Sequence, residues 1–106
     1  MNKRNIILIG MPGAGKSSVG VILAKALGYE FIDTDLVIQH REKRLLREII
    51  ADEGNEGFLA IENEVNATLE ADKSVIAPGG SAIYGKEAME HFKEIAEGLH
   101  MSPNKL

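Results

Sequence analysis

The chain has 106 residues and a formal net charge of −4; 44% of its residues are hydrophobic, 5% are aromatic and none is cysteine. This length has room for one domain, residues 1–106, with a small aliphatic core, and the negative charge argues against a nucleic-acid-binding surface. The lack of cysteine excludes a disulfide framework and thiolate chemistry and is typical of a reducing cytoplasm, where we expect the protein.

The N-terminal segment begins with an apolar run, residues 6–9, that predicts a strand. This run is too short for a signal peptide or a membrane span, so we expect no membrane partner. Residues 10–17, GMPGAGKS, follow directly and match the pattern G-x-x-x-x-G-K-[ST] without a mismatch. A helix is predicted from about Lys16 to Leu27, and this strand–loop–helix context separates a working phosphate loop from a chance match.

The chemistry of this loop suits a nucleotide phosphate. Its glycines let backbone N–H groups approach phosphate oxygens, and the helix N-terminus adds a partial positive charge. Lys16 would contact the β- and γ-phosphates, and the Ser17 hydroxyl would bind Mg²⁺. The alternative is a glycine-rich turn before an ordinary helix.

Strand and helix patterns alternate along the rest of the chain, which is typical of a parallel α/β sheet. We predict strands at 29–33 and 74–77, and helices after Asp35 with a break near Lys43, at 45–50, around 58–69 and at 86–96. The apolar residues at helical spacing are Val19, Leu23, Ala26 and Leu27, then Phe58, Ile61, Val65 and Leu69, then Met89, Phe92 and Ile95 or Ala96. The basic cluster Arg41, Lys43, Arg44 and Arg47 is interleaved with glutamates and predicts a solvated helix face.

The C-terminal segment carries a weaker signal. Residues 99–101 suggest a stub of a fourth strand, and Ser102-Pro103 has the pattern of an N-cap followed by the first residue of a helix. We expect three clear strands, with the C-terminal strands and the lid largely missing. An unstructured tail is the alternative.

Two further loops follow predicted strands and would meet the phosphate loop at one edge of the sheet, where ligands bind in open parallel sheets. Asp33-Thr34-Asp35 offers two carboxylates that point to the same face if the backbone stays extended, although such an aspartate is often only a helix cap. Gly79-Gly80 allows a ligand to approach the backbone closely, and a tight strand-to-helix turn is the alternative.

Together these motifs resemble the shikimate kinase family over about residues 5–97. The matching features are the phosphate loop, Val19-Gly20, Leu23-Ala24, Leu27-Gly28, Phe31, Asp33-Thr34-Asp35, Glu48-Ile49, Gly54, Phe58, Glu62 and Gly79-Gly80. Gluconate kinases are similar but usually have D-G-D at the second loop, so they rank lower. The resemblance implies a P-loop fold that transfers the γ-phosphate of ATP, with Mg²⁺, to a hydroxyl of shikimate.

The resemblance also implies a role for each matching residue. Asp33 would hold the metal through water together with Ser17, and Asp35 would bind the acceptor hydroxyls and accept the proton as a catalytic residue beside Lys16. Gly79 and Gly80 would contact the acceptor through their backbone. The residues implied in ATP binding are Gly13, Ala14, Gly15, Lys16, Ser17 and Ser18.

This chain departs from the family pattern at the acceptor. The family has an arginine after the phenylalanine that matches Phe58, and this arginine pairs with the shikimate carboxylate, whereas this chain has Leu59. Ser81 replaces the third glycine of the later loop, and no arginine follows Arg47. These departures leave open a catalytically weak or inactive nucleotide-binding module, or a kinase for an acceptor without a carboxylate.

A final expectation concerns association. In the family the first strand lies between the third and the fourth, so a stub at 99–101 would leave residues 6–9 as an unpaired apolar edge. Such an edge predicts a homodimer or aggregation.

Overall fold

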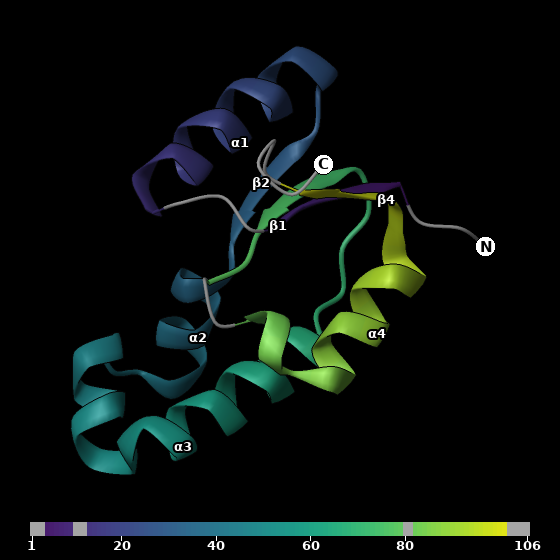
Figure 1. The fold of residues 1–106 in the computed structure, drawn as a ribbon. Helices are drawn as coiled ribbons and strands as arrows, with labels where there is room; N and C mark the ends of the chain where they lie inside the picture. Colours follow the sequence, from purple (N-terminus) through teal and green to yellow (C-terminus); the bar gives the residue numbers. More distant parts are fainter. Residues whose placement is uncertain (1–3, 10–12, 80–81, 102–106) are drawn as a thin grey trace.

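The computed structural model describes residues 4–9, 13–79 and 82–101, and these ranges form a parallel sheet flanked by helices (Figure 1). The strands are β1 (Asn5–Ile9), β2 (Glu30–Asp33), β3 (Ser74–Ala77) and β4 (Ala96–Met101). The helices are α1 (Gly13–Leu27), α2 (Thr34–Glu42), α3 (Leu46–Ala67) and α4 (Lys86–Ile95), with a short 3₁₀ turn, η1 (Ala82–Tyr84), before α4. The predicted α/β class and parallel sheet are confirmed.

The sheet has the strand order β2-β3-β1-β4 in the described ranges, and neighbouring strands in this order pair in parallel. Asp33 at the end of β2 pairs in register with Ala77 at the end of β3, so both strands end at the same edge. The two strands next to β1 are β3 and β4.

The fourth strand corrects two expectations. β4 begins directly after α4 and pairs with β1, with Ile6 opposite Gly98 and Ile9 opposite Met101. The expectation of three strands and a stub is therefore wrong, and so is the expectation that β1 has an unpaired edge. The run 96–101, AEGLHM, has no β-branched residue and contains a glycine, so its local strand signal is weak. The strand conformation of residues 96–101 depends on backbone hydrogen bonds to β1, which the local sequence does not indicate.

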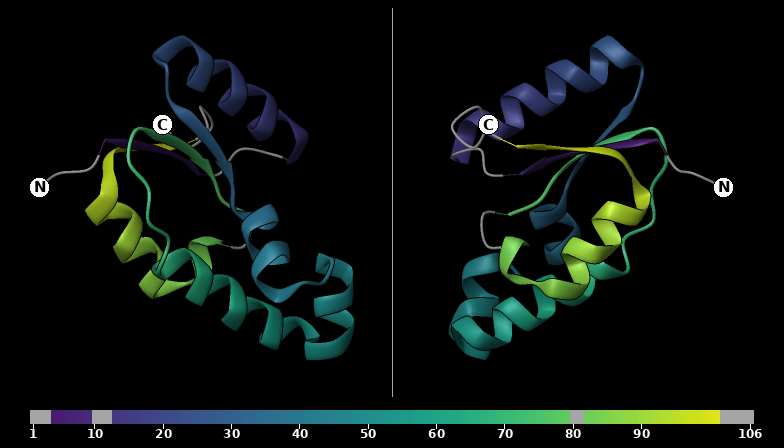
Figure 2. Two further views of the ribbon diagram at one scale, coloured as in Figure 1. Left: turned by 180° about the vertical axis from the view of Figure 1, so that it is seen from behind. Right: turned by 45° about the vertical axis from the view of Figure 1, so that its right-hand side comes forward.

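Helices cover both faces of the sheet, with α1 on one side and α3 and α4 on the other (Figures 1 and 2). Side chains alternate along β1, so Leu8 packs toward α1 with Ala24, while Ile7 and Ile9 pack toward α4. Phe92 of α4 is fully buried against this second face. A sheet covered on both faces requires apolar residues in succession, as β1 and β3 have.

The face of α1 that meets the sheet differs from the predicted stripe. Leu23 packs against the sheet as expected, but Val19 is 42% exposed and Leu27 is 45% exposed. The helix is apolar nearly all round, so periodicity could not single out the buried side. Gly20 lies on the side of α1 that faces the sheet. A Cβ at this position would be 2.4 Å from the ring of Phe31.

The central helices follow the predicted breaks with one change. Lys43 ends α2 in a left-handed conformation, with φ of 57°, as the break near that residue predicts. The separate patterns at 45–50 and 58–69 form one element, α3, kinked at Gly54, where φ is 77°. Leu69 lies beyond the end of α3 but still packs against the core on the α4 side.

The basic cluster near the start of α3 makes ion pairs. Arg44 contacts Glu42 at 3.1 Å and Asp52 at 3.1 Å, and Arg41 contacts Glu64 of α3. These pairs join α2 to α3 at a solvated surface, as the interleaved charges predict. None of the helices in the described part of the chain combines the length and the apolar character that a membrane-spanning segment requires.

Candidate functional site

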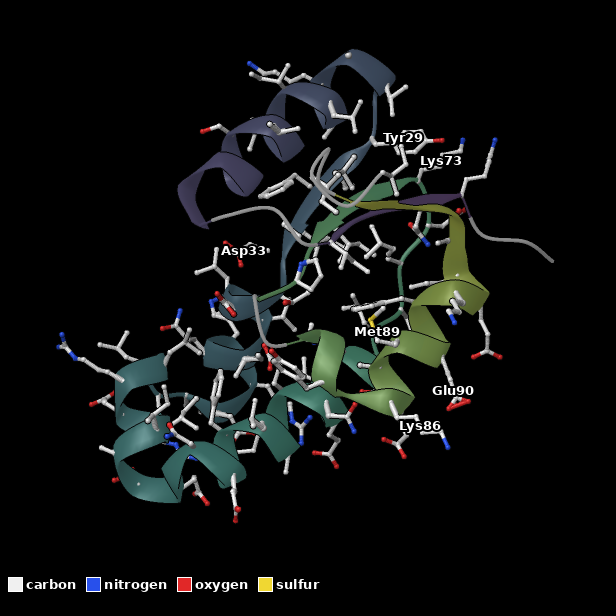
Figure 3. The ribbon with its side chains drawn as sticks, viewed as in Figure 1. Tyr29, Asp33, Lys73, Lys86, Met89 and Glu90 are labelled. Carbon is white, nitrogen blue, oxygen red and sulfur yellow. The ribbon has the colours of Figure 1, made fainter. Side chains whose placement is uncertain are left out.

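The candidate site lies at the edge where β1, β2 and β3 end. β1 and β3 are neighbours, and the helices that follow them, α1 and α4, cover opposite faces of the sheet. Ligands of open parallel sheets bind at such a point, where the chain connections diverge. Figure 3 shows Asp33 at this edge, whereas Tyr29 and Lys73 lie at the opposite end of the sheet.

The phosphate-loop motif has the predicted context. β1 ends at Ile9 and α1 begins at Gly13, so the loop connects a central strand to a helix N-terminus that lies at the site. Residues 10–12 lie outside the described residues, and of residues 13–17 only the helical backbone is described. Ser18 is exposed on α1. The phosphate-binding roles of Gly13, Ala14, Gly15, Lys16, Ser17 and Ser18 stay predictions.

Asp33 is the N-cap of α2. Its Oδ1 accepts a hydrogen bond from the backbone N–H of Asp35 at 2.9 Å, and its own backbone is extended, with φ of −98° and ψ of 112°. The condition that both aspartates lie on an extended backbone is therefore not met, because α2 begins at Thr34. The helix-cap alternative holds for Asp33, and its metal role stays a prediction.

The carboxylates of Asp35 and Glu62 meet at Gly79. A methyl group on Gly79 would lie 2.9 Å from Oδ1 of Asp35 and 2.7 Å from Oε2 of Glu62. Asp35 comes from the first turn of α2, and Glu62 comes from α3 and is 2% exposed. A side chain at this position would require both carboxylates to shift, so Gly79 lets α2, α3 and the segment after β3 meet at one backbone position.

Gly79 also begins a turn, because its carbonyl accepts the backbone N–H of Ala82 at 3.0 Å. Gly79 therefore both begins a tight turn and lets other groups, the carboxylates of Asp35 and Glu62, approach the backbone closely. Gly80 and Ser81 lie outside the described residues, so the predicted role of Gly80 is not tested.

A cavity of about 300 Å³ opens beside this cluster between α3 and the η1–α4 segment. Leu59, which is 38% exposed, lies one turn before Glu62 on α3, and both side chains line the cavity. Lys86 and Glu87, at the start of α4, line it from the other side. The remaining lining residues are Ala60, Asn63, Ala82, Tyr84 and Gly85.

Glu62 is the site residue that reasoning from single motifs missed, since it entered only as part of the resemblance. A signal for it exists in the sequence. Phe58, Ile61 and Val65 form the apolar stripe of α3, and Glu62 occupies a position of that stripe. An acidic residue at a core position of a helix indicates a role other than solvation.

Comparison with known proteins identifies close similarity. A family model described as shikimate kinase matches residues 12–104. Shikimate kinase 2 of Yersinia enterocolitica is 45% identical over 80 residues, which are 76% of this chain and 46% of that protein. Shikimate kinase of Nostoc sp. is 46% identical over 84 residues, which are 78% of this chain and 46% of that protein.

Solved structures agree with these matches. Shikimate kinase from Acinetobacter baumannii in complex with shikimate superposes with a TM-score of 0.79 at 30% identity, covering 95% of this chain and 56% of that one. The 1.7 Å crystal structure of shikimate kinase from Bacteroides thetaiotaomicron has a TM-score of 0.78 at 30% identity, covering 92% of this chain and 55% of that one. The chain spans about half the length of the relatives that it matches.

Proposed function

Because this chain belongs to the shikimate kinase family, we propose that it acts in the transfer of the γ-phosphate of ATP to a hydroxyl of shikimate. The observation that carries the proposal is the convergence of three loops at one sheet edge. The N-terminus of α1 follows β1 there, and the carboxylates of Asp35 and Glu62 meet the backbone of Gly79 after β3.

On this proposal the loop after β1 binds the phosphates of ATP. The backbone N–H groups of Gly13, Ala14 and Gly15 lie at the start of α1, where partial positive charge favours an anion. Lys16 would neutralise charge on the β- and γ-phosphates, and Ser17 and Ser18 would complete the contacts. Catalysis of phosphoryl transfer rests mainly on positioning and on such charge stabilisation.

The donor set at the edge fits Mg²⁺. Asp33 uses Oδ1 to cap α2, which holds the carboxylate in a fixed orientation at the end of β2. Mg²⁺ prefers oxygen ligands and retains several waters, so one carboxylate acting through water, with the Ser17 hydroxyl, suits it. When bound through these two residues, Mg²⁺ would supply positive charge that offsets the negative charge developing during transfer.

On this proposal Asp35 would orient and deprotonate the acceptor. Its carboxylate is half-buried beside Gly79, and a hydroxyl bound there would donate its hydrogen bond to a carboxylate oxygen. The proton would then pass to Asp35 as the hydroxyl oxygen attacks the γ-phosphorus, while the bond from that phosphorus to the β–γ bridging oxygen breaks and ADP leaves. The backbone of Gly79 and Gly80 would contact the rest of the acceptor.

The cellular location and the assembly of the protein stay proposals. A cytoplasmic location is supported by the lack of cysteine. The expected homodimer depended on an unpaired edge at β1, but β4 pairs with β1. In the described residues the edge strands are β2 and β4.

Nucleotide binding and turnover test the proposal. Calorimetric titration with ATP and Mg²⁺ should show binding that Lys16→Ala weakens roughly 10- to 100-fold, the effect of losing one charge-assisted contact. Lys25→Ala, in the last turn of the same helix, is the matched control and should bind as the unmodified chain does. An ADP-release assay should then show a saturable, shikimate-dependent rate. Equal binding by both variants, or a rate that shikimate does not raise, would contradict the proposal.

A further inference from the structure

Two buried polar side chains have no hydrogen-bond partner among the described residues. They are Thr34, through its hydroxyl, and Asn66, through both polar atoms of its carboxamide. Both residues are fully buried. Leaving a buried donor or acceptor unpaired destabilises the folded state, and nearly all such groups in folded proteins are paired with protein or with ordered water. The two side chains therefore indicate a ligand that supplies the missing hydrogen bonds.

Thr34, the first residue of α2, faces α3. Ile32, two residues earlier on β2, packs against the same core cluster as Leu69, which follows α3. Ile38, one turn later on α2, belongs to a second cluster with Val65 of α3. Residues two apart on a strand, or four apart on a helix, share a face. The Thr34 side chain thus lies where the two clusters meet.

Asn66 lies on the face of α3 that meets the start of α2. Glu62, one turn earlier on that face, comes close to Asp35 beside Gly79, and Asp35 is the residue after Thr34. The two helices therefore approach each other at positions that flank both unpartnered side chains. This places Thr34 and Asn66 in one buried seam between α2 and α3.

We propose that Thr34 and Asn66 bind an internal water molecule in this seam. The hydroxyl can donate and accept, and the carboxamide offers two donors and an acceptor, so a water molecule can pair with both. Internal waters typically make about three hydrogen bonds to otherwise unpaired groups. The hydroxyl and the carboxamide are uncharged and suit a neutral ligand better than an ion. The water links the start of α2 to α3, and this site does not depend on the proposed phosphoryl transfer.

A double-mutant cycle in urea unfolding of the whole chain tests whether the two groups share a ligand. Thr34→Val and Asn66→Leu each remove one partner of the water and leave the other group under-paired, so each should raise the unfolding equilibrium constant. The double variant removes both polar groups. Its constant should be about 5- to 10-fold smaller than the product of the two single effects predicts.

Thr68→Val provides the matched control, because it makes the same change at an exposed hydroxyl that donates to the carbonyl of Glu64. Thr68 lies outside the seam. When Thr68→Val is combined with Asn66→Leu, the two effects on the unfolding constant should therefore simply multiply.

Oxygen-17 relaxation dispersion of the solvent tests the water itself, since it detects water molecules held inside a protein and is blind to the protein's own hydroxyl groups. The dispersion amplitude should fall by the contribution of about one water in the double variant Thr34→Val with Asn66→Leu. Thr68→Val should leave the amplitude unchanged.

Three results would overturn the proposal. Stabilisation by both single substitutions would show a dry seam, because removing an unpaired polar group then only relieves its cost of burial. Effects that simply multiply for Thr34 and Asn66 would show that the two groups share no ligand. Coupling with an unchanged dispersion amplitude would assign a direct hydrogen bond between the two side chains. None of these measurements uses turnover, so the proposed function stands or fails separately.

Discussion

Asn63 of α3 caps the N-terminus of α4 by accepting the backbone N–H of Ala88 with its Oδ1, at 3.0 Å. Its Nδ2 also donates to Oε1 of Glu87, at 2.9 Å. Gly85, the N-cap residue of α4, has no side chain for this purpose, and a Cβ there would lie 2.3 Å from Oδ1 of Asn63. The helix that carries Leu59 and Glu62 is thereby fixed to the helix on the other side of the cavity.

Loss of this cap should destabilise the fold. Asn63→Ala removes the acceptor for the Ala88 N–H, and we expect the free energy of unfolding in urea to fall by about 1–2 kcal/mol. Lys86→Ala, at an exposed position in the first turn of α4, is the control and should change it far less. Equal effects of the two substitutions would show that the cap does not stabilise the fold.

The same contact should appear in the titration of Glu87. The hydrogen bond from Asn63 is the main cause that holds the pKa of Glu87 below its ordinary value of 4.5, and the charge of Lys86 is a smaller one. Stability from this contact is present above the ordinary pKa and is lost as the pH falls through the lowered one. In an NMR titration, Asn63→Ala should raise the pKa of Glu87 more than Lys86→Ala does. The reverse order would contradict the assignment.

Asn5 should matter as much as a large core residue. This fully buried side chain donates to the carbonyls of Ala71 and Ile95, each at 2.9 Å, and accepts the Ser74 N–H at 3.1 Å. Asn5→Ala leaves three backbone groups without these partners, two of them in buried hydrogen bonds and one in a part-buried bond, so we expect a loss of about 3 kcal/mol in urea unfolding. Thr68→Ala, at an exposed position, provides the comparison; a similar loss there would remove the special role of Asn5.

Gly20→Ala sets helix propensity against packing. Alanine gains about 1 kcal/mol over glycine inside a helix. Its Cβ would lie 2.4 Å from Cε1 of Phe31, and overpacking costs about 1–3 kcal/mol. We expect net destabilisation of up to about 2 kcal/mol by thermal unfolding, whereas Val21→Ala, on the exposed side of α1, should have a small effect. A more stable Gly20→Ala variant would mean that the ring of Phe31 moves aside freely.

Gly79→Ala should weaken acceptor binding. The new methyl group would displace the carboxylates of Asp35 and Glu62 from their present positions. Since small displacements in a site reduce its function strongly, we expect about a tenfold loss of affinity for shikimate by NMR titration. Nucleotide affinity is the control and should not change. Unchanged shikimate binding would place the acceptor elsewhere.

Several features could be predicted because their signals are local. The strand at 74–77 is a short apolar run bounded by turn residues, and the phosphate-loop context depends on a motif and its immediate neighbours. The break near Lys43 occurs where the chain adopts a left-handed conformation, whereas the kinked continuation of α3 through Gly54 was not predicted.

The sequence by itself thus determined the fold class, the loops that meet at the sheet edge and the family to which they are similar. Only the tertiary structure decided that residues 96–101 pair with β1, that Gly20 faces Phe31, and that Asp33 caps a helix while Glu62 joins Asp35 at Gly79. Each of these depends on atoms brought together from separate elements or on the exact backbone turn. Strand pairing and side-chain packing depend on neighbours that are distant in the sequence, so the periodicity of one segment cannot predict them.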